Sequence, residues 1–184
     1  MSDYGELVEY LNARDSEMCQ RKLHRLPITY YSESECGCFI TICARQHGEP
    51  FADAELARTI VDSLLWQRNR EKWLLYCYCL MPDHLHFIAR LLNGDTDKVN
   101  AGARGRTQKG ILDHVSDFKK YTTSQIWWKR GGTGALWQKS SYDHIIRWPD
   151  SAEAAVQYVL NNPVRKGLVE HWDDYPFSGV VDSL

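Results

Sequence analysis

Two strand-length apolar runs in the middle of the chain are separated by only three residues. Trp73 to Leu80 reads WLLYCYCL, His84 to Leu92 reads HLHFIARLL, and Met81, Pro82 and Asp83 lie between them. Two β-prone runs joined by a short segment with Pro and Asp are typical of a β-hairpin. An antiparallel sheet is therefore the expected centre of the fold.

Further elements flank this hairpin, and their order defines a fold class. Apolar residues at strand or helical spacing predict the strand Cys38–Arg45, the helices Ala52–Arg70 and Ile111–Lys129, the strand Leu136–Trp148 and the helix Asp150–Asn162. Strand, helix, strand, strand, helix, strand is the order of the ferredoxin-like split βαβ sandwich, an α+β fold whose two helices cover one face of an antiparallel sheet. The last predicted helix is appended to this core at its C-terminal side.

The length of 184 residues fits one domain with a single core. Residues 1–35 are polar and are expected to form an N-terminal extension or arm, with a short helix near Tyr4–Arg14, ahead of a single domain over residues 36–184. Residues 93–109 are rich in Gly, Asp and Arg and are expected to form a loop.

The N-terminus is acidic and no run of about 18 apolar residues occurs, so a cytoplasmic protein is expected. The cysteines in apolar, strand-like runs lack CxxC spacing, which favours reduced core thiols over a disulfide scaffold. These are Cys36, Cys38, Cys77 and Cys79.

Charge is distributed unevenly along the chain. Residues 101–147 hold nine basic and three acidic residues, a balance of +6, within a chain of net charge -2. The remainder holds 22 minus 9 basic and 24 minus 3 acidic residues, a balance of -8. A positive segment on an acidic body favours a polyanionic partner such as nucleic acid, and a solvated charged surface is the alternative.

The second run of the hairpin has one wholly apolar face and one face that carries two histidines. If the apolar face packs on the core, His84 and His86 project from the opposite, open face of the sheet with Cα atoms roughly 6.6 Å apart. Two imidazoles at this spacing suit a single metal ion, and two surface histidines are the alternative.

A structural zinc site that combines this histidine pair with Cys77 and Cys79 is a further alternative. With a three-residue turn, Leu80 faces His84 and both thiols lie on the core side of the sheet. A shift of the register by one residue would bring the thiols to the histidine face, so this alternative depends on the turn length.

Polar groups gather at the end of the last predicted helix. Tyr158 lies about 160° from Val156 on the helical wheel, away from the apolar stripe, and Asn162 follows one turn later. Pro163 is expected to end or kink the helix close to Arg165. A phenol, an amide and a guanidinium therefore share one helix end, and an ordinary amphipathic helix with a half-buried tyrosine is the alternative.

Three ordered motifs resemble one known family. They are LMPDHLHF at 80–87, LWQKSSYDHIIR at 136–147, and VQYVLNNPVRKGLV at 156–169 followed by DYPFS at 174–178. Together they resemble the REP-associated tyrosine transposases, relatives of the single-tyrosine HUH transposases of bacterial insertion sequences. The resemblance runs from about Leu26 to Ser178 and includes the segments RLPITYY and CFITICA.

The resemblance implies a role for each candidate residue. His84 and His86 would be the metal-binding pair, Asn162 a third ligand of Mg²⁺ or Mn²⁺, and Tyr158 the nucleophile of a catalytic domain over residues 36–184. The implied reaction is metal-dependent cleavage and strand transfer of single-stranded or hairpin DNA at palindromic repeats. It would proceed through a covalent 5′-phosphotyrosine that leaves a free 3′-OH.

DNA contacts are expected from basic residues that lie mainly in the positive segment: Arg104, Arg106, Lys119, Lys120, Arg130, Arg147 and Arg165. A binding module of the same fold that recognises hairpin DNA without cleaving it is the alternative to an enzyme, and a metal phosphoesterase of another class is a third possibility. No membrane contact is expected, and a monomer and a homodimer both stay open.

Overall fold

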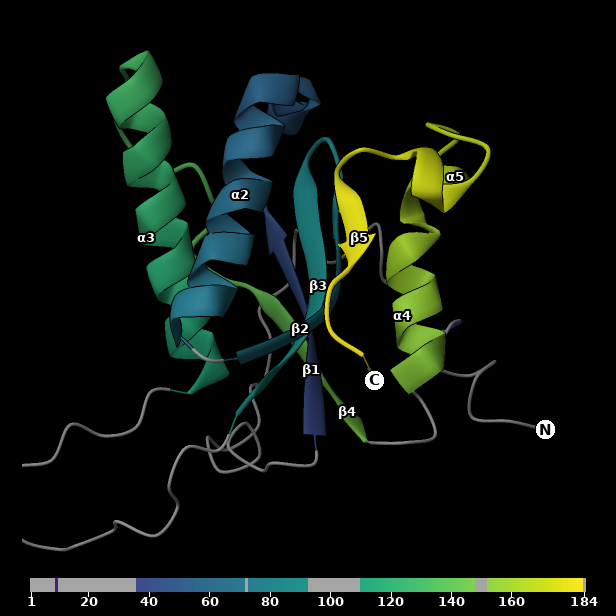
Figure 1. The fold of residues 1–184 in the computed structure, drawn as a ribbon. Coiled ribbons are helices and arrows are strands. Elements are labelled where there is room, and N and C mark those ends of the chain that lie inside the picture. Colours follow the sequence, from purple (N-terminus) through teal and green to yellow (C-terminus); the bar gives the residue numbers. More distant parts are fainter. Residues whose placement is uncertain (1–8, 10–35, 72, 93–109, 148–151, 184) are drawn as a thin grey trace, which may run out of the picture.

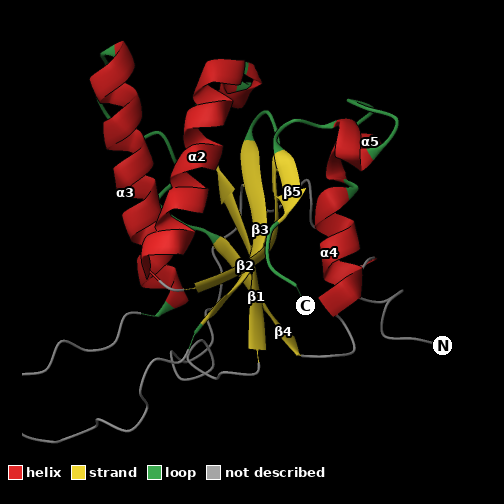
Figure 2. Cartoon of the chain, in the orientation of Figure 1, coloured by secondary structure: helices red, strands yellow, loops and turns green. Residues whose placement is uncertain are grey.

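A five-stranded sheet in which every pair of neighbouring strands is antiparallel forms the middle layer of the protein (Figures 1 and 2). The structure is a computed structural model that describes residues 9, 36–71, 73–92, 110–147 and 152–183. The strand order is β4-β1-β3-β2-β5. The strands are β1 (Cys36–Cys43), β2 (Trp73–Leu80), β3 (His84–Leu91), β4 (Tyr142–Arg147) and β5 (Ser178–Val180). The predicted hairpin lies at the centre of this sheet.

Helices cover both faces of the sheet. Helices α2 (Ala54–Glu71) and α3 (Ile111–Arg130) pack side by side on one face, as the ferredoxin-like order predicts. The appended helix α4 (Ala152–Leu160) lies on the opposite face and is followed by the short helix α5 (Asn162–Arg165) (Figure 1). Helix α4 therefore covers the face of the sheet that the sequence analysis expected to be open.

Each face of the sheet has its own hydrophobic core. The core under α2 and α3 includes Ile40, Leu75 and Phe87, and the core under α4 includes Phe39 and Ile88. Successive residues of a strand point to opposite faces, so a sheet that is covered on both sides needs apolar residues at nearly every position. This explains why the central runs read as almost continuously apolar.

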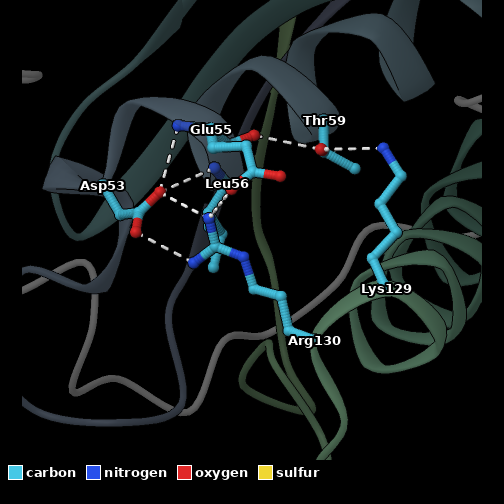
Figure 3. Close-up of polar contacts among 6 residues, drawn as sticks. All are labelled: Asp53, Glu55, Leu56, Thr59, Lys129 and Arg130. Atoms are coloured by element: carbon cyan, nitrogen blue, oxygen red, sulfur yellow. Dashed lines mark hydrogen bonds and ion pairs between the residues drawn. The ribbon is translucent and has the colours of Figure 1, made fainter.

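A cluster of charged residues fixes the N-terminus of α2 against the C-terminus of α3 (Figure 3). The Asp53 carboxylate accepts hydrogen bonds from the backbone N–H groups of Glu55 (3.0 Å) and Leu56 (2.9 Å), as an N-cap does. The Arg130 guanidinium donates to both Asp53 oxygens, at 2.9 and 2.7 Å, and to Glu55 Oε2 at 2.9 Å. We call Asp53, Glu55 and Arg130 the helix clamp. Beside it, the Lys129 ammonium donates to Thr59 Oγ1 at 3.5 Å.

The predicted elements are confirmed with shifts at their ends, apart from β4 and β5. The fourth strand begins at Tyr142 instead of Leu136, although Trp137 forms an isolated bridge with Ala44. Strand β5 was not predicted, because three residues at a sheet edge carry no periodic signal. The last predicted helix divides into α4 and α5 next to Pro163, where a kink was expected.

The hairpin register differs from the predicted one by a single residue. Leu80 pairs with Leu85, and Cys79 pairs with His86, because the Met81 backbone N–H donates to the His84 carbonyl at 2.7 Å and shortens the turn to Pro82 and Asp83. A one-residue change of register moves side chains to the other face of a sheet. The prediction that Cys77 and Cys79 lie on the side of α2 and α3 is therefore wrong, and both belong to the core under α4.

The N-terminal arm, the helix near Tyr4–Arg14 and the loop 93–109 lie outside the described residues, except for residue 9. In the part of the chain that the structure describes, no helix is both long enough and apolar enough to cross a membrane. Cys38, Cys77 and Cys79 are free, buried thiols, as expected. Cys43, which was not among the cysteines expected to be reduced, is disulfide-bonded.

Candidate active site

The two histidines at the start of β3 converge as predicted. His84 and His86 lie on the α4 side of the sheet, and their Nε2 atoms are 2.9 Å apart. Their rings meet edge to face with centroids 4.4 Å apart. His84 is 8% exposed and His86 is fully buried, so neither is an ordinary surface histidine.

Each histidine is oriented through its other ring nitrogen. Asp83 Oδ1 lies 2.6 Å from His84 Nδ1, and Thr41 Oγ1 lies 2.7 Å from His86 Nδ1. Thr41 reaches His86 because the two residues are paired in register between β1 and β3. The hydrogen bond with His84 lowers the pKa of the Asp83 carboxyl, against the opposing effect of burial. A carboxylate or hydroxyl behind an imidazole is the arrangement that fixes the tautomer of a metal-binding histidine.

The hydrogen bonds of the pair are compatible with two protonation patterns. Asp83 keeps the proton of His84 on Nδ1, so His84 Nε2 presents a lone pair. If Thr41 donates to His86 Nδ1, His86 Nε2–H donates to His84; if Thr41 accepts, both Nε2 atoms present lone pairs. The rotatable Thr41 hydroxyl therefore lets His86 serve either as a hydrogen-bond donor or as a metal ligand.

The distance between the two Nε2 atoms fits a divalent cation. An octahedral ion with ligands at about 2.1 Å places neighbouring ligand atoms about 3 Å apart. The observed 2.9 Å matches that spacing. A third oxygen ligand is then required from another element of the fold.

Asn162 supplies a candidate for that oxygen. Its side chain is fully buried, and its Nδ2 donates to the Tyr158 carbonyl at 3.0 Å. Its Oδ1 is buried and accepts no hydrogen bond from any described residue. A buried amide oxygen without a donor is costly, and a cation would satisfy it.

Tyr158 faces the histidine pair from α4. Its ring centroid lies 6.1 Å from that of His86 and 5.9 Å from that of Phe39, both in edge-to-face geometry. The Arg165 guanidinium lies over the same ring, 4.8 Å from the centroid. The Tyr158 phenol and the Arg165 guanidinium, which were expected to share one helix end, therefore lie together next to the histidine pair.

The environment of Tyr158 differs from the one the helical wheel suggested. The tyrosine lies off the predicted apolar stripe, yet it is only 3% exposed. Helix α4 packs on the sheet, and the later chain folds back so that Trp172 and Tyr175 also pack against this core. Burial on several sides makes the apolar stripe of α4 wider than a surface helix would need.

Comparison with known proteins gives two kinds of match. No family model matches the chain. The chain is 29% identical over 101 residues to the REP-associated tyrosine transposase of Escherichia coli K12, covering 55% of the chain and 50% of that relative. It is 26% identical over 100 residues to a Haemophilus influenzae protein assigned as a REP-associated tyrosine transposase, covering 54% of each. The chain thus spans about half the length of the curated relatives it matches.

A solved structure of a REP-associated tyrosine transposase bound to a REP hairpin has the same fold. It matches with a TM-score of 0.63 at 20% identity, over 86% of this chain and 82% of that one. The resemblance to REP-associated tyrosine transposases is confirmed. At this identity the structural match shows the ferredoxin-like fold, and the roles of individual residues stay predictions.

Among the described residues, a zinc site with cysteine ligands has little support. Cys79 lies opposite His86 on the same face, so the argument that the thiols are hidden behind the sheet fails. Burial raises the pKa values of Cys77 and Cys79 well above the usual value, so both are neutral thiols when no metal is bound. Among the described residues, no group of three or more His, Cys, Asp or Glu side chains is arranged to hold a metal.

The basic residues predicted to bind DNA in the manner of these transposases are distributed over several sites. Lys119 and Lys120 lie on α3, and Arg165 lies over Tyr158. Arg130 is held in the helix clamp, where two carboxylates neutralise its charge. Arg104 and Arg106 lie outside the described residues, and Arg147 ends β4 with its side chain not described.

Sequence reasoning missed two residues that support the histidine pair. Asp83 precedes His84 directly, so its position was a usable local signal. Thr41 is 45 residues from His86 and is brought to it only by strand pairing, so no local pattern could have identified it.

Proposed function

We propose that this chain is a metal-dependent single-strand DNA endonuclease and strand transferase that acts on hairpin DNA of palindromic repeats. The observation that carries this proposal is the position of Tyr158, whose ring lies edge to face with His86, one of two convergent histidines that are each oriented through Nδ1. The names of the curated relatives and the hairpin bound to the structural neighbour support the substrate class. An enzyme that acts on cellular DNA in this way would work in the cytoplasm.

In the proposed reaction, His84 Nε2, His86 Nε2 and Asn162 Oδ1 would hold Mg²⁺ or Mn²⁺. When bound, the cation supplies polarisation of a non-bridging phosphate oxygen. The Tyr158 hydroxyl oxygen attacks the phosphorus and gives up its proton, and the P–O3′ bond breaks as the leaving O3′ takes up a proton. The products are a 5′-phosphotyrosine and a free 3′-OH. The reverse attack by a 3′-OH joins strands without a high-energy cofactor.

Arg165 has a positioning role in this proposal. Its guanidinium packs on the Tyr158 ring at 4.8 Å, so it restricts the orientation of the nucleophile. It also places a positive charge next to the position of the scissile phosphate, where charge develops during attack.

A hairpin-binding module that has lost cleavage is the second candidate. Such a module would keep the fold and the basic residues, but it would not need the side chains of Tyr158, Asn162 and the two histidines. The buried Asn162 amide oxygen favours the enzyme, because a binding module gains nothing from such an oxygen without a donor. The proposal is neutral between a monomer and a homodimer.

The test is formation of a covalent adduct between the protein and a labelled hairpin oligonucleotide in the presence of Mn²⁺. We expect a labelled band on a denaturing gel for the wild type and none for Tyr158→Phe, with hairpin binding retained within a few-fold. The matched control is Tyr142→Phe, since Tyr142 also packs against Phe39 on this face and should still permit the adduct. Mass spectrometry that finds the nucleotide on Tyr142 would reverse the assignment, and binding without any wild-type adduct would favour the binding module.

A further inference from the structure

A basic groove lies between α3 and the segment that precedes β4. It has a volume of about 620 Å³, and the charged residues among its described lining are all basic: Arg45, Lys119, Lys120 and Lys139. Ser116, Thr123 and Ser124 also line it, and the Thr123 hydroxyl already donates to the Lys119 carbonyl at 2.7 Å. Ammonium, guanidinium and hydroxyl groups are the donors that typically bind phosphate oxygens, and no described carboxylate of the lining would repel a phosphate.

We propose that this groove binds the phosphodiester backbone of a DNA strand without reading its bases. The choice of DNA as the ligand rests on the proposed function. The groove extends that function, because its residues lie outside the site formed by the histidines and Tyr158. Arg45 was not among the residues that the sequence indicated for DNA contact, since it follows β1 outside the positive segment.

Hydrogen bonds hold the two walls of the groove, α3 and the segment before β4, in place. Lys119 Nζ donates to the carbonyls of Gln138 (3.1 Å) and Ser140 (2.7 Å), which ties the segment before β4 to α3. The Trp137 indole N–H donates to Thr122 Oγ1 at 2.8 Å, and Trp137 is only 3% exposed. A preformed cavity of this kind binds with little loss of conformational entropy.

The outer charges of the groove are available to a ligand. Arg45 and Lys139 are exposed, and neither forms an ion pair with any residue that the structure describes. Lys120 forms an ion pair with Asp117 at 3.5 Å, but its side chain is 75% exposed, so this pair is weak. Arg130 is different, because the helix clamp already satisfies its guanidinium.

The groove and the histidine pair lie at the same end of the sheet. The Arg45 backbone N–H donates to the Leu136 carbonyl, and the neighbouring Ala44 N–H donates to the Asp83 carbonyl, both at 2.8 Å. Asp83 in turn holds His84. A strand that leaves the groove past Arg45 therefore arrives next to the residues that carry the proposed chemistry.

Backbone contact is favoured over base contact. Trp137 is the one aromatic residue among the described residues of the lining, and it is buried with its N–H already engaged. Base stacking needs an exposed aromatic face, which this lining does not offer. The groove should accordingly bind single strands of different sequence with similar affinity.

The test measures binding of a fluorescein-labelled single-stranded dT20 by anisotropy, without metal, for Arg45→Ala/Lys139→Ala. Loss of two phosphate contacts should make the slope of log K against log salt shallower by about 1.4 and lower the affinity about 25-fold at 0.1 M salt. A mixed-sequence 20-mer should show the same changes. The charge-conserving double variant Arg45→Lys/Lys139→Arg should keep the slope and most of the affinity.

The matched control is Arg58→Ala/Lys129→Ala, which removes the same charge from exposed positions of α2 and α3 outside the groove. An equal loss of affinity in this control, or an unchanged slope in the groove variant, would overturn the proposal. Tighter binding of fluorescein-labelled polyglutamate than of dT20 would also overturn it and point to an acidic polypeptide. Because this assay reads binding alone, a wild type that binds dT20 through the groove but forms no adduct would refute the nuclease and leave the groove standing.

Discussion

At the scale of single residues, the histidine pair depends on two supports of different chemistry. Asp83 is a carboxylate that holds one protonation pattern of His84, whereas Thr41 is a hydroxyl that accommodates two patterns of His86. Supports of this kind contribute to metal affinity because they orient the imidazole and set its tautomer before the ion arrives.

Thr41→Val should lower Mn²⁺ affinity by about tenfold, because the isosteric side chain cannot hydrogen-bond to His86 Nδ1. Isothermal titration calorimetry measures this change. Thr59→Val is the control, since Thr59 Oγ1 contacts a helix carbonyl on the far side of the sheet. Equal affinity of Thr41→Val and the wild type would show that His86 is oriented by its packing alone.

Replacement of either histidine by alanine should abolish Mn²⁺ binding and cleavage, but the two changes should differ in their effect on stability. His84 is 8% exposed and His86 is not exposed at all, so His84→Ala should lower the unfolding free energy less than His86→Ala. His86 is fully buried against Phe39, so His86→Ala should cost roughly 1–3 kcal/mol. Urea denaturation and calorimetry measure both effects. Retained nicking activity in His84→Ala together with a lower melting temperature would return the pair to a structural role.

At the scale of secondary-structure elements, the helix clamp carries a pH-dependent part of the stability. The hydrogen bond from Arg130 lowers the pKa of Asp53 far below its usual value, and the backbone N–H groups of Leu56 and Glu55 add to this shift. A carboxyl whose pKa is lower in the folded state stabilises the protein above its unfolded-state pKa, and that stability is lost as the pH falls toward the folded-state pKa.

Asp53→Asn should therefore reduce the acid sensitivity of the fold. Carboxyl groups titrate between about pH 5 and pH 2, and over this range the melting temperature of the variant should fall less than that of the wild type. At pH 7 the variant should be the less stable protein, because the ion pair with Arg130 is absent. Asp173→Asn, at an exposed position of the short helix Trp172–Asp174, is the control and should follow the wild-type profile.

At the scale of the whole molecule, positive charge is concentrated on part of an acidic protein. The chain carries a net charge of -2, yet every charged side chain that the structure describes in the lining of the basic groove is a cation. A local positive surface attracts a polyanion although the molecule as a whole would repel it, and this attraction is screened by salt.

DNA affinity of the wild type should consequently fall steeply with salt. With about four to six phosphates engaged, the slope of log K against log salt should be roughly -3 to -4 for a single strand. Anisotropy titrations at salt concentrations between about 50 and 300 mM test this expectation. A flat response would identify the positive segment as a solvated surface.

Local patterns along the chain determined the elements and their order. The apolar runs of the hairpin predicted β2 over Trp73–Leu80 and the start of β3 at His84, and both agree with the structure. Helical spacing located α2 and α3 to within a few residues. These features follow from the sequence because side-chain periodicity reflects the geometry of a single segment. The convergence of two histidines two residues apart on a strand is local in the same sense.

Contacts between distant segments were decided only by the tertiary structure. The turn length set the hairpin register and so the face of Cys79, while strand pairing brought Thr41 to His86. Packing of α4 on the second face of the sheet buried Tyr158 beside His86. A bridge after β1 placed Arg45 at the basic groove. Each outcome depends on the free energy of burying surfaces from separate parts of the chain against one another, which no short window of sequence contains.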